Sequence, residues 1–129
     1  MDGPPVTMSR YADESRKIAT GEVTIKGRQH LTYRFKVEPE MYGAILIGEF
    51  KVAGANDIGA AVLTEDENAN LISSKRANVL WSTEGKKTAG KCQRLLPPGE
   101  LCLTFTNLYS ASDKHIFLDF DLRWQRKIP

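Results

Sequence analysis

The feature that most constrains the fold of this chain is a two-residue alternation of apolar and polar side chains. Apolar residues occupy every second position in residues 31–37, and again in residues 116–124, where charged residues fill most of the intervening positions. Successive side chains of a β-strand point to opposite faces, so this pattern predicts strands with one face in a core and the other in water.

Shorter apolar runs recur along the rest of the chain, and residues rich in Gly, Pro, Asn and Asp separate them. They lie at residues 23–25, 46–52, 58–63, 79–81 and 101–105. Helical periodicity is weak, with room for about one turn in residues 70–78. We therefore expect an all-β fold, an antiparallel two-sheet β-sandwich that is jelly-roll-like and has about eight strands.

Length and charge limit the classes of protein to which the chain can belong. Its 129 residues suffice for one domain with its own core. We expect a flexible N-terminal arm over residues 1–20, the sandwich over residues 21–124 and a basic tail over residues 125–129. A net charge of +2 argues against a nucleic-acid partner. No apolar run reaches the roughly 20 residues of a transmembrane segment. From the lack of a basic start followed by an apolar stretch we expect no secretory signal in this chain, which fits either a cytoplasmic chain or a mature exported one.

The two cysteines, Cys92 and Cys102, flank a turn signal that contains Pro98 and Gly99. We expect them on neighbouring strands of a hairpin. In one register of that hairpin the two thiols face each other and can form a disulfide. In another register, which opposes Cys102 to Leu95, they remain two free, half-buried thiols. Two thiolates without further ligands nearby do not indicate a metal site.

Three stretches, residues 54–67, 96–110 and 114–124, resemble the GOLD (Golgi dynamics) domain and its bacterial look-alikes. The shared features are a small-residue bend with Asn-Asp before a strand, a Pro-Gly turn, a strand ending in Phe-x-Asn-x-Tyr-Ser, and a long final strand. In that frame Pro98 and Gly99 close a hairpin and Phe105 fills the core. Asn107 satisfies backbone groups at the strand end, and Tyr109 packs its ring and directs its hydroxyl to a partner.

The resemblance implies a non-catalytic β-sandwich that mediates protein contacts or cargo selection, because GOLD domains occur in secretory-pathway cargo receptors and in lipid-transfer and adaptor proteins. This chain has no coiled coil or membrane span of the cargo-receptor kind, so that particular role does not carry over. A weaker resemblance, carried by residues 33–37 and the later Pro-Gly turn, is to accessory sandwich domains of secreted bacterial peptidases.

No sequence motif indicates catalysis, a cofactor or a metal. His30 and His115 are the two histidines, and neither lies in a motif with a nucleophile. The acidic residues 65–68 lack the ligand spacing and central glycine of a calcium loop, so we expect a solvated turn there. We therefore expect no catalytic residue, no bound cofactor and no metal ligand.

The interaction candidates are the basic residues Lys86, Lys87 and Arg123 and the apolar Phe117, which falls on the outward row of the last strand. Alternatively, the lysines protect a sheet edge and the arm covers Phe117. We expect an interaction domain that binds a protein partner, with self-association as a further option. An accessory carbohydrate- or lipid-binding module is the alternative, and a small enzyme comes third. Several exposed aromatic rings on one face would favour carbohydrate, whereas a cleft holding a histidine beside another polar group would favour an enzyme.

Overall fold

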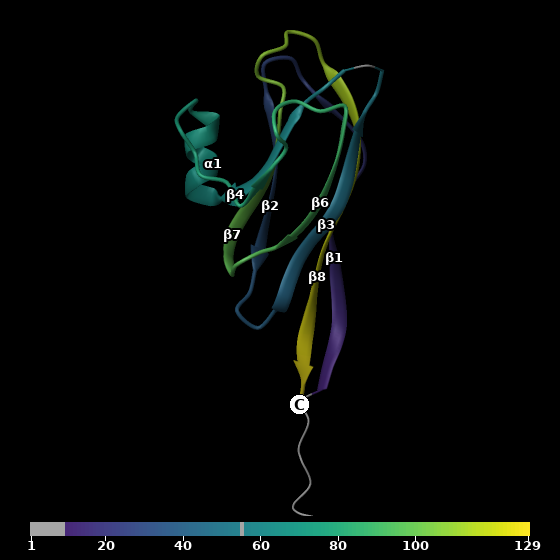
Figure 1. Ribbon diagram of the computed structural model, residues 1–129, viewed down its shortest axis with the longest axis vertical. Helices are drawn as coiled ribbons and strands as arrows, with labels where there is room; N and C mark the ends of the chain where they lie inside the picture. Colours follow the sequence, from purple (N-terminus) through teal and green to yellow (C-terminus); the bar gives the residue numbers. More distant parts are fainter. Residues whose placement is uncertain (1–9, 55) are drawn as a thin grey trace, which may run out of the picture.

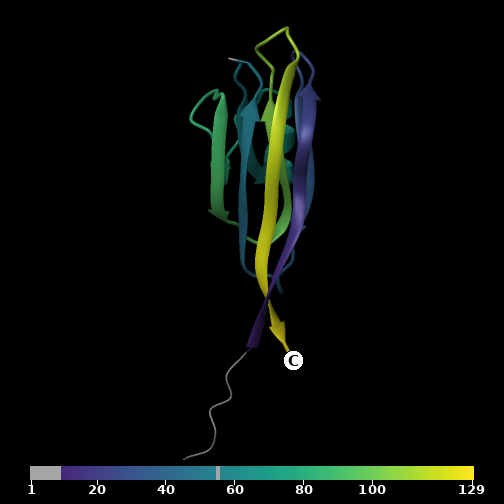
Figure 2. The same ribbon diagram turned by 90° about the vertical axis from the view of Figure 1, so that its right-hand side faces the viewer.

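Two antiparallel sheets face each other and enclose one core. The computed structural model describes residues 10–54 and 56–129. Figures 1 and 2 show the two layers, with one short helix outside them. The elements are β1 (Arg10–Ile25), β2 (His30–Val37), β3 (Tyr42–Val52), β4 (Gly59–Thr64), α1 (Glu65–Ile72), β5 (Trp81–Ser82), β6 (Ala89–Leu95), β7 (Gly99–Thr106) and β8 (Lys114–Ile128).

The strand order identifies the topology. Sheet A has the order β1-β8-β3-β6 and sheet B the order β2-β7-β4-β5. The chain therefore behaves as one long hairpin: β4 pairs with β5 near its tip, β3 with β6, β2 with β7, and β1 with β8. Wrapping this hairpin so that β3 meets β8 and β4 meets β7 produces the eight-strand jelly roll. The predicted all-β, jelly-roll-like sandwich is confirmed.

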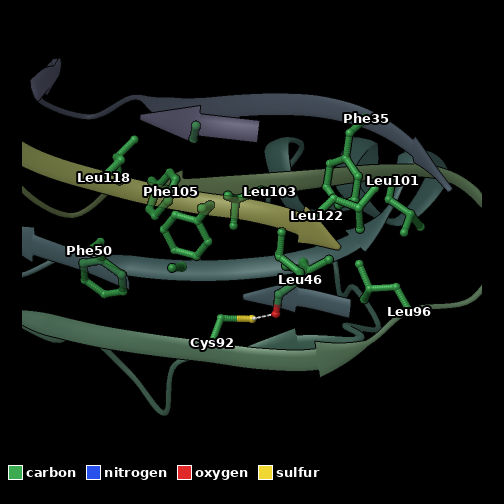
Figure 3. Close-up of a cluster of buried hydrophobic side chains, with 14 of the residues drawn as sticks. Phe35, Leu46, Phe50, Cys92, Leu96, Leu101, Leu103, Phe105, Leu118 and Leu122 are labelled. Atoms are coloured by element: carbon green, nitrogen blue, oxygen red, sulfur yellow. Dashed lines mark hydrogen bonds between the residues drawn. The ribbon is translucent and has the colours of Figure 1, made fainter. Parts of the chain in front are cut away.

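The core lies between the inner faces of the two sheets, as the alternation predicts. Phe105 on β7 is fully buried, and its ring packs edge-to-face against three others. The ring centres lie 5.9 Å apart for Phe50, 5.7 Å for Phe120 and 6.3 Å for Tyr33. Such edge-to-face contacts add to the hydrophobic gain from burying the rings. Figure 3 shows this cluster, to which Phe35, Leu46, Leu96, Leu101, Leu103, Leu118 and Leu122 also contribute.

The arm and tail boundaries expected from the sequence are wrong for the residues that the structure describes. Residues 10–20 belong to β1, which pairs with β8 from Arg10 opposite Ile128 to Ile25 opposite Lys114. Residues 125–128 belong to β8. The composition of residues 10–20 is that of an arm because an edge strand needs few apolar side chains. The backbone hydrogen bonds that stabilise this strand cannot be recognised from composition. Residues 1–9 of the expected arm lie outside the described part.

The acidic residues after β4 begin a helix instead of forming a turn. The Thr64 side chain caps α1 by accepting a hydrogen bond from the Glu67 N–H at 3.3 Å. Three acidic residues in the first turn favour the helix because they complement its positive N-terminal dipole. The expected helical turn in residues 70–78 therefore starts earlier, at Glu65. Asn68 is buried and accepts a hydrogen bond from the Thr104 hydroxyl at 2.6 Å, which ties α1 to the outer face of sheet B.

The segment around Pro98 and Gly99 joins the two sheets and does not close a hairpin. β6 lies in sheet A and β7 in sheet B, so the expected pairing of these strands is wrong. Gly99 begins β7 with a φ of 142°, a conformation that L side chains rarely adopt. Cys92 and Cys102, on different sheets, are two free buried thiols and not a disulfide. The chain does turn at Pro98 and Gly99, as the sequence predicts, but the turn leads from sheet A to sheet B.

Candidate functional site

The outer face of sheet A is the broad surface that the described elements leave uncovered, whereas α1 packs on the outer face of sheet B. Figure 2 looks onto sheet A, with β8 in yellow between β1 and β3. The register aligns outward side chains in rows across the strands: Phe117 on β8 lies opposite Glu22 on β1 and Lys51 on β3, and Lys51 lies opposite Ala89 on β6.

Phe117 stands on this face between two hollows and is 49% exposed. One hollow, of about 590 Å³, is lined by residues that include Glu22, Thr24, Lys51 and His115. The other, of about 580 Å³, lies toward β6 and is lined by residues that include Lys51, Ala89, Gly90 and Lys91. We call Phe117 with these seven neighbours (Glu22, Thr24, Lys51, Ala89, Gly90, Lys91 and His115) the Phe117 face.

The strands that frame the face explain why it is hollowed. Ala89 begins β6 on the same outward row as Phe117 and has a side chain of one methyl group, so space remains between it and the Phe117 ring. Gly90 is required by the core, because a Cβ built there would lie 2.5 Å from the Phe50 ring. The small Ala89 side chain thus leaves a depression on the outer face, whereas Gly90 permits close packing on the inner face.

Polar groups surround the Phe117 ring. The His115 Nδ1 atom is 2.9 Å from the Thr24 hydroxyl, and both residues are exposed. Beyond His115, the Gly27 N–H donates to Asp113 at 2.9 Å; this bond, with the nearby Lys26 ammonium, lowers the pKa of the Asp113 carboxyl. Within the described ranges, no group of three or more His, Cys, Asp or Glu side chains is placed to hold a metal ion. The site therefore offers an apolar ring with hydrogen-bonding and charged groups around it.

Arg123 lies on the same outward row of β8 as Phe117, six residues further along. At about 3.4 Å per residue, the two positions are about 20 Å apart. Between them, the Lys17 ammonium bridges Asp119 and Asp121 at 3.1 Å each. Hydrogen bonds to Asp121 and then Asp119 raise the pKa of Lys17. Arg123 is 3.9 Å from Asp121, so it belongs to this charged strip and does not contact the ring.

Lys86 and Lys87 lie elsewhere, in the loop between β5 and β6. The Lys86 ammonium is 5.4 Å from the centre of the Tyr109 ring, which the β7–β8 loop carries. Tyr109 is 78% exposed, so the expectation that its ring packs into the fold is wrong. The Lys87 backbone forms a bridge with Ile58 through hydrogen bonds of 2.8 and 3.0 Å. Sequence reasoning missed the Lys86–Tyr109 pair because it depends on two loops meeting at one end of the sandwich.

Asn107 has the role expected of it. It is 4% exposed, and its amide nitrogen lies 2.8 Å from the Ser112 carbonyl oxygen, 3.2 Å from that of Lys26 and 3.3 Å from that of Ile25. The side chain therefore ties the end of β1 to the loop after β7.

The two histidines do not come together. His30 is on sheet B, where its Nδ1 atom is 3.1 Å from the Thr106 hydroxyl. Its Nε2 atom is buried and has no hydrogen-bond partner in the described part of the chain. Desolvation lowers the pKa of His30, which favours the neutral ring.

The cysteines are placed as structural residues. Burial raises the pKa of the Cys92 thiol to about 11, and its Sγ atom donates to the Leu46 carbonyl at 3.7 Å (Figure 3). Burial also raises the pKa of Cys102. Since the thiolate is the reactive form, neither cysteine is set up as a nucleophile.

No protein-family model matches the chain, and no curated protein matches it either. None of the helices in the described segments is long and apolar enough to cross a membrane. Geometry and chemistry alone therefore single out the Phe117 face. Sequence reasoning identified Phe117 from its position on an outward row, but it missed Glu22, Thr24 and Lys51. Their strands were visible in the pattern, whereas the register that places them beside Phe117 was not.

Proposed function

We propose that this chain is a non-catalytic, GOLD-like interaction domain that binds a protein partner on the Phe117 face of sheet A. The observation that carries the proposal is the half-exposed Phe117 ring between hollows of about 590 and 580 Å³. A partner side chain can enter either hollow and contact the ring. At the rim, Lys51 and Glu22 can form ion pairs with charged groups of the partner. Aromatic residues with a polar rim are typical of protein interfaces.

Binding accounts for this face better than catalysis does. His115 hydrogen-bonds to a threonine hydroxyl, and both groups are open to solvent. Catalytic acid–base groups act in sites that exclude water and are oriented by a further polar group. The hollow around His115 offers hydrogen bonds to a ligand but does not isolate a reacting bond from water.

A protein partner also fits better than a carbohydrate. Carbohydrate stacking uses flat aromatic rings, and the described strands bring one such ring to this part of the face. The outward neighbours of Phe117 are instead charged or small residues and one histidine. They are Thr20, Glu22, Thr24, Glu49, Lys51, Ala89, Lys91, His115 and Asp119.

Site-specific photo-crosslinking tests the proposal. A photoreactive amino acid at position 89, in the hollow beside Phe117, should capture a discrete partner in cells of the source organism. Phe117→Ala should weaken binding of that partner by about three- to tenfold, because the ring is 49% exposed and completing its burial contributes about half of the roughly 1.5–3 kcal/mol for a Phe side chain. Tyr109→Ala, which removes an exposed ring on the loop end, is the matched control and should leave binding unchanged.

The proposal fails if Phe117→Ala and Tyr109→Ala reduce capture equally, or if neither reduces it. Binding of the same variants to a glycan array tests the alternative that the ligand is a carbohydrate. Glycan binding that depends on Phe117 would replace the protein partner with a carbohydrate. Circular dichroism and urea unfolding should show that both variants remain folded, since both side chains are substantially exposed.

A further inference from the structure

Among the strands that the structure describes, β1 has the longest unpaired edge. β1 has 16 residues and lies at the end of sheet A, where β8 is its one hydrogen-bonded neighbour among residues 10–54 and 56–129. Alternate N–H and C=O groups along it therefore point away from the sheet and can pair with another strand. A β-bulge between Lys17 and Ala19 interrupts the regular edge, so the uninterrupted part is residues 10–17.

The first residues of this part, 10–12, extend beyond the last pair of β3 and β8. Figures 1 and 2 show β1 and β8 continuing together past the other strands as a two-stranded ribbon. The pairing of β3 with β8 ends at Tyr42 opposite Gln125, whereas the pairing of β1 with β8 continues to Arg10 opposite Ile128. An isolated two-stranded ribbon is marginally stable in water, so a further strand would stabilise it.

The charges along the free edge are complementary to themselves. The order is Arg10, then Asp13 and Glu14, then Arg16 and Lys17. If two copies of the segment pair antiparallel about Ser15, Asp13 faces Lys17 of the second copy and Glu14 faces Arg16. Residues directly opposite each other in an antiparallel pair lie on the same face and interact. Pairing about the middle of residues 10–17 would instead oppose like charges, so the charge pattern selects the register about Ser15.

Most of these side chains are accessible for such contacts, whereas Glu14 is half-buried and already forms an ion pair with Arg126. Asp13, Ser15, Arg16 and Lys17 are exposed. Within the described residues, neither Asp13 nor Arg16 has an ion-pair partner: Asp13 accepts a hydrogen bond from Gln125 at 3.2 Å, and the Arg16 guanidinium lies 5.8 Å from the centre of the Trp124 ring. A second copy therefore brings an opposite charge to each of two side chains that lack one.

We propose that two copies of this chain associate through β1, antiparallel about Ser15, and join their sheets A into one continuous sheet. The contact is isologous, because each copy contributes the same segment. The two-fold axis is perpendicular to the sheet, so both Phe117 faces lie on the same side of the dimer. A partner with two matching sites would then be held by both faces, which raises apparent affinity without new contacts.

Sedimentation velocity over a range of concentrations tests the proposal on the purified chain, with no other partner present. The wild type should show a reversible monomer–dimer equilibrium. Lys17→Asp places two carboxylates opposite each other and should raise the dimer dissociation constant at least tenfold. The double variant Asp13→Lys/Lys17→Asp restores opposite charges across the interface and should recover the dimer.

The double variant separates an effect on the interface from an effect within the chain. Lys17 also bridges Asp119 and Asp121, and the double variant leaves that bridge broken. Recovery of the dimer therefore reports on the contact between copies. Lys75→Asp makes the same change in charge on an exposed residue after α1 and should leave the equilibrium unchanged. Arg16→Glu, with and without Glu14→Arg, repeats the design at an independent pair.

Hydrogen exchange provides a second measurement. Amides of residues 10–17 should become more protected as the concentration rises, while amides elsewhere keep their protection. A wild type that stays monomeric at all concentrations, or a double variant that stays as dissociated as Lys17→Asp, would overturn the proposal. Because none of these measurements uses the Phe117 partner, failure here leaves the proposed function standing, and failure of that function leaves the dimer standing.

Discussion

Replacing Asn107 by alanine should cost more stability than any other single polar substitution at the loop end of the sandwich. The Asn107 amide nitrogen is within 3.3 Å of the carbonyl oxygens of Ile25, Lys26 and Ser112. It lies at 4% exposure, where water cannot readily take its place. Alanine would leave these carbonyl oxygens without their side-chain donor.

The magnitude follows from the number of bonds lost. An amide has two N–H groups, and each hydrogen bond contributes about 1 kcal/mol net, which gives about 2 kcal/mol. Leaving a buried carbonyl without a donor adds about 1 kcal/mol. The free energy of unfolding should therefore fall by about 3 kcal/mol. With a urea m-value of about 2 kcal/mol/M, the unfolding midpoint should fall by about 1.5 M.

Urea unfolding followed by tryptophan fluorescence measures this change. Asn78→Ala is the matched control because its exposed side chain makes no hydrogen bond within the described residues; it should change stability by less than about 0.5 kcal/mol. Asn107→Asp should be less stable than Asn107→Ala at neutral pH, because a carboxylate would face carbonyl oxygens with no proton to donate. The reasoning is refuted if the unfolding free energy of Asn107→Ala stays within about 0.5 kcal/mol of the wild type. It is also refuted if Asn107→Asp is as stable as the wild type.

Two further predictions concern the packing of sheet A and the thiols. Gly48→Ala should destabilise by about 2 kcal/mol or more, because its Cβ would lie 2.6 Å from the Phe120 Cα, whereas Gly59→Ala has ordinary contacts and should change little; urea unfolding of the pair checks this. Cys92 and Cys102 should resist a thiol reagent in the folded protein and titrate as two thiols after unfolding without reductant. Because burial raises the pKa of Cys92 to about 11, unfolding free energy should fall as pH rises from its unfolded pKa near 8.5 toward 11; rapid native labelling or a flat alkaline profile would contradict this.

Much of the core could be predicted from alternation alone. The alternating residues of β2 contact the core, and those of β8 are buried from Ile116 to Leu122. The two-residue alternation is a local property of a strand with one buried face, so it can be recognised without knowing the partner strand. Asn107 and Phe105 also have the expected roles, since each depends on where a strand ends or which way it faces.

Other expectations failed where strand pairing was needed. Cys92 and Cys102 are close in sequence, yet their strands belong to different sheets, because the jelly roll pairs β6 with β3 and β7 with β2 and β4. The acidic residues after Thr64 read as a solvated turn, since an eight-residue helix with a weak apolar stripe has little periodic signal. Its buried contact, Asn68 with Thr104, is visible only once α1 is packed on sheet B.

The amino-acid pattern is enough to establish the class of fold, the strand faces that meet the core, and Phe117 as an apolar residue on an outward row. These follow from local periodicity, which is encoded one strand at a time. The arrangement of the strands in space is needed to see that residues 10–20 are an edge strand, that Phe117 lies between two hollows, and that Lys86 contacts the Tyr109 ring. Each of these depends on the register and order of strands far apart in the chain, and a two-residue repeat fits many registers equally well.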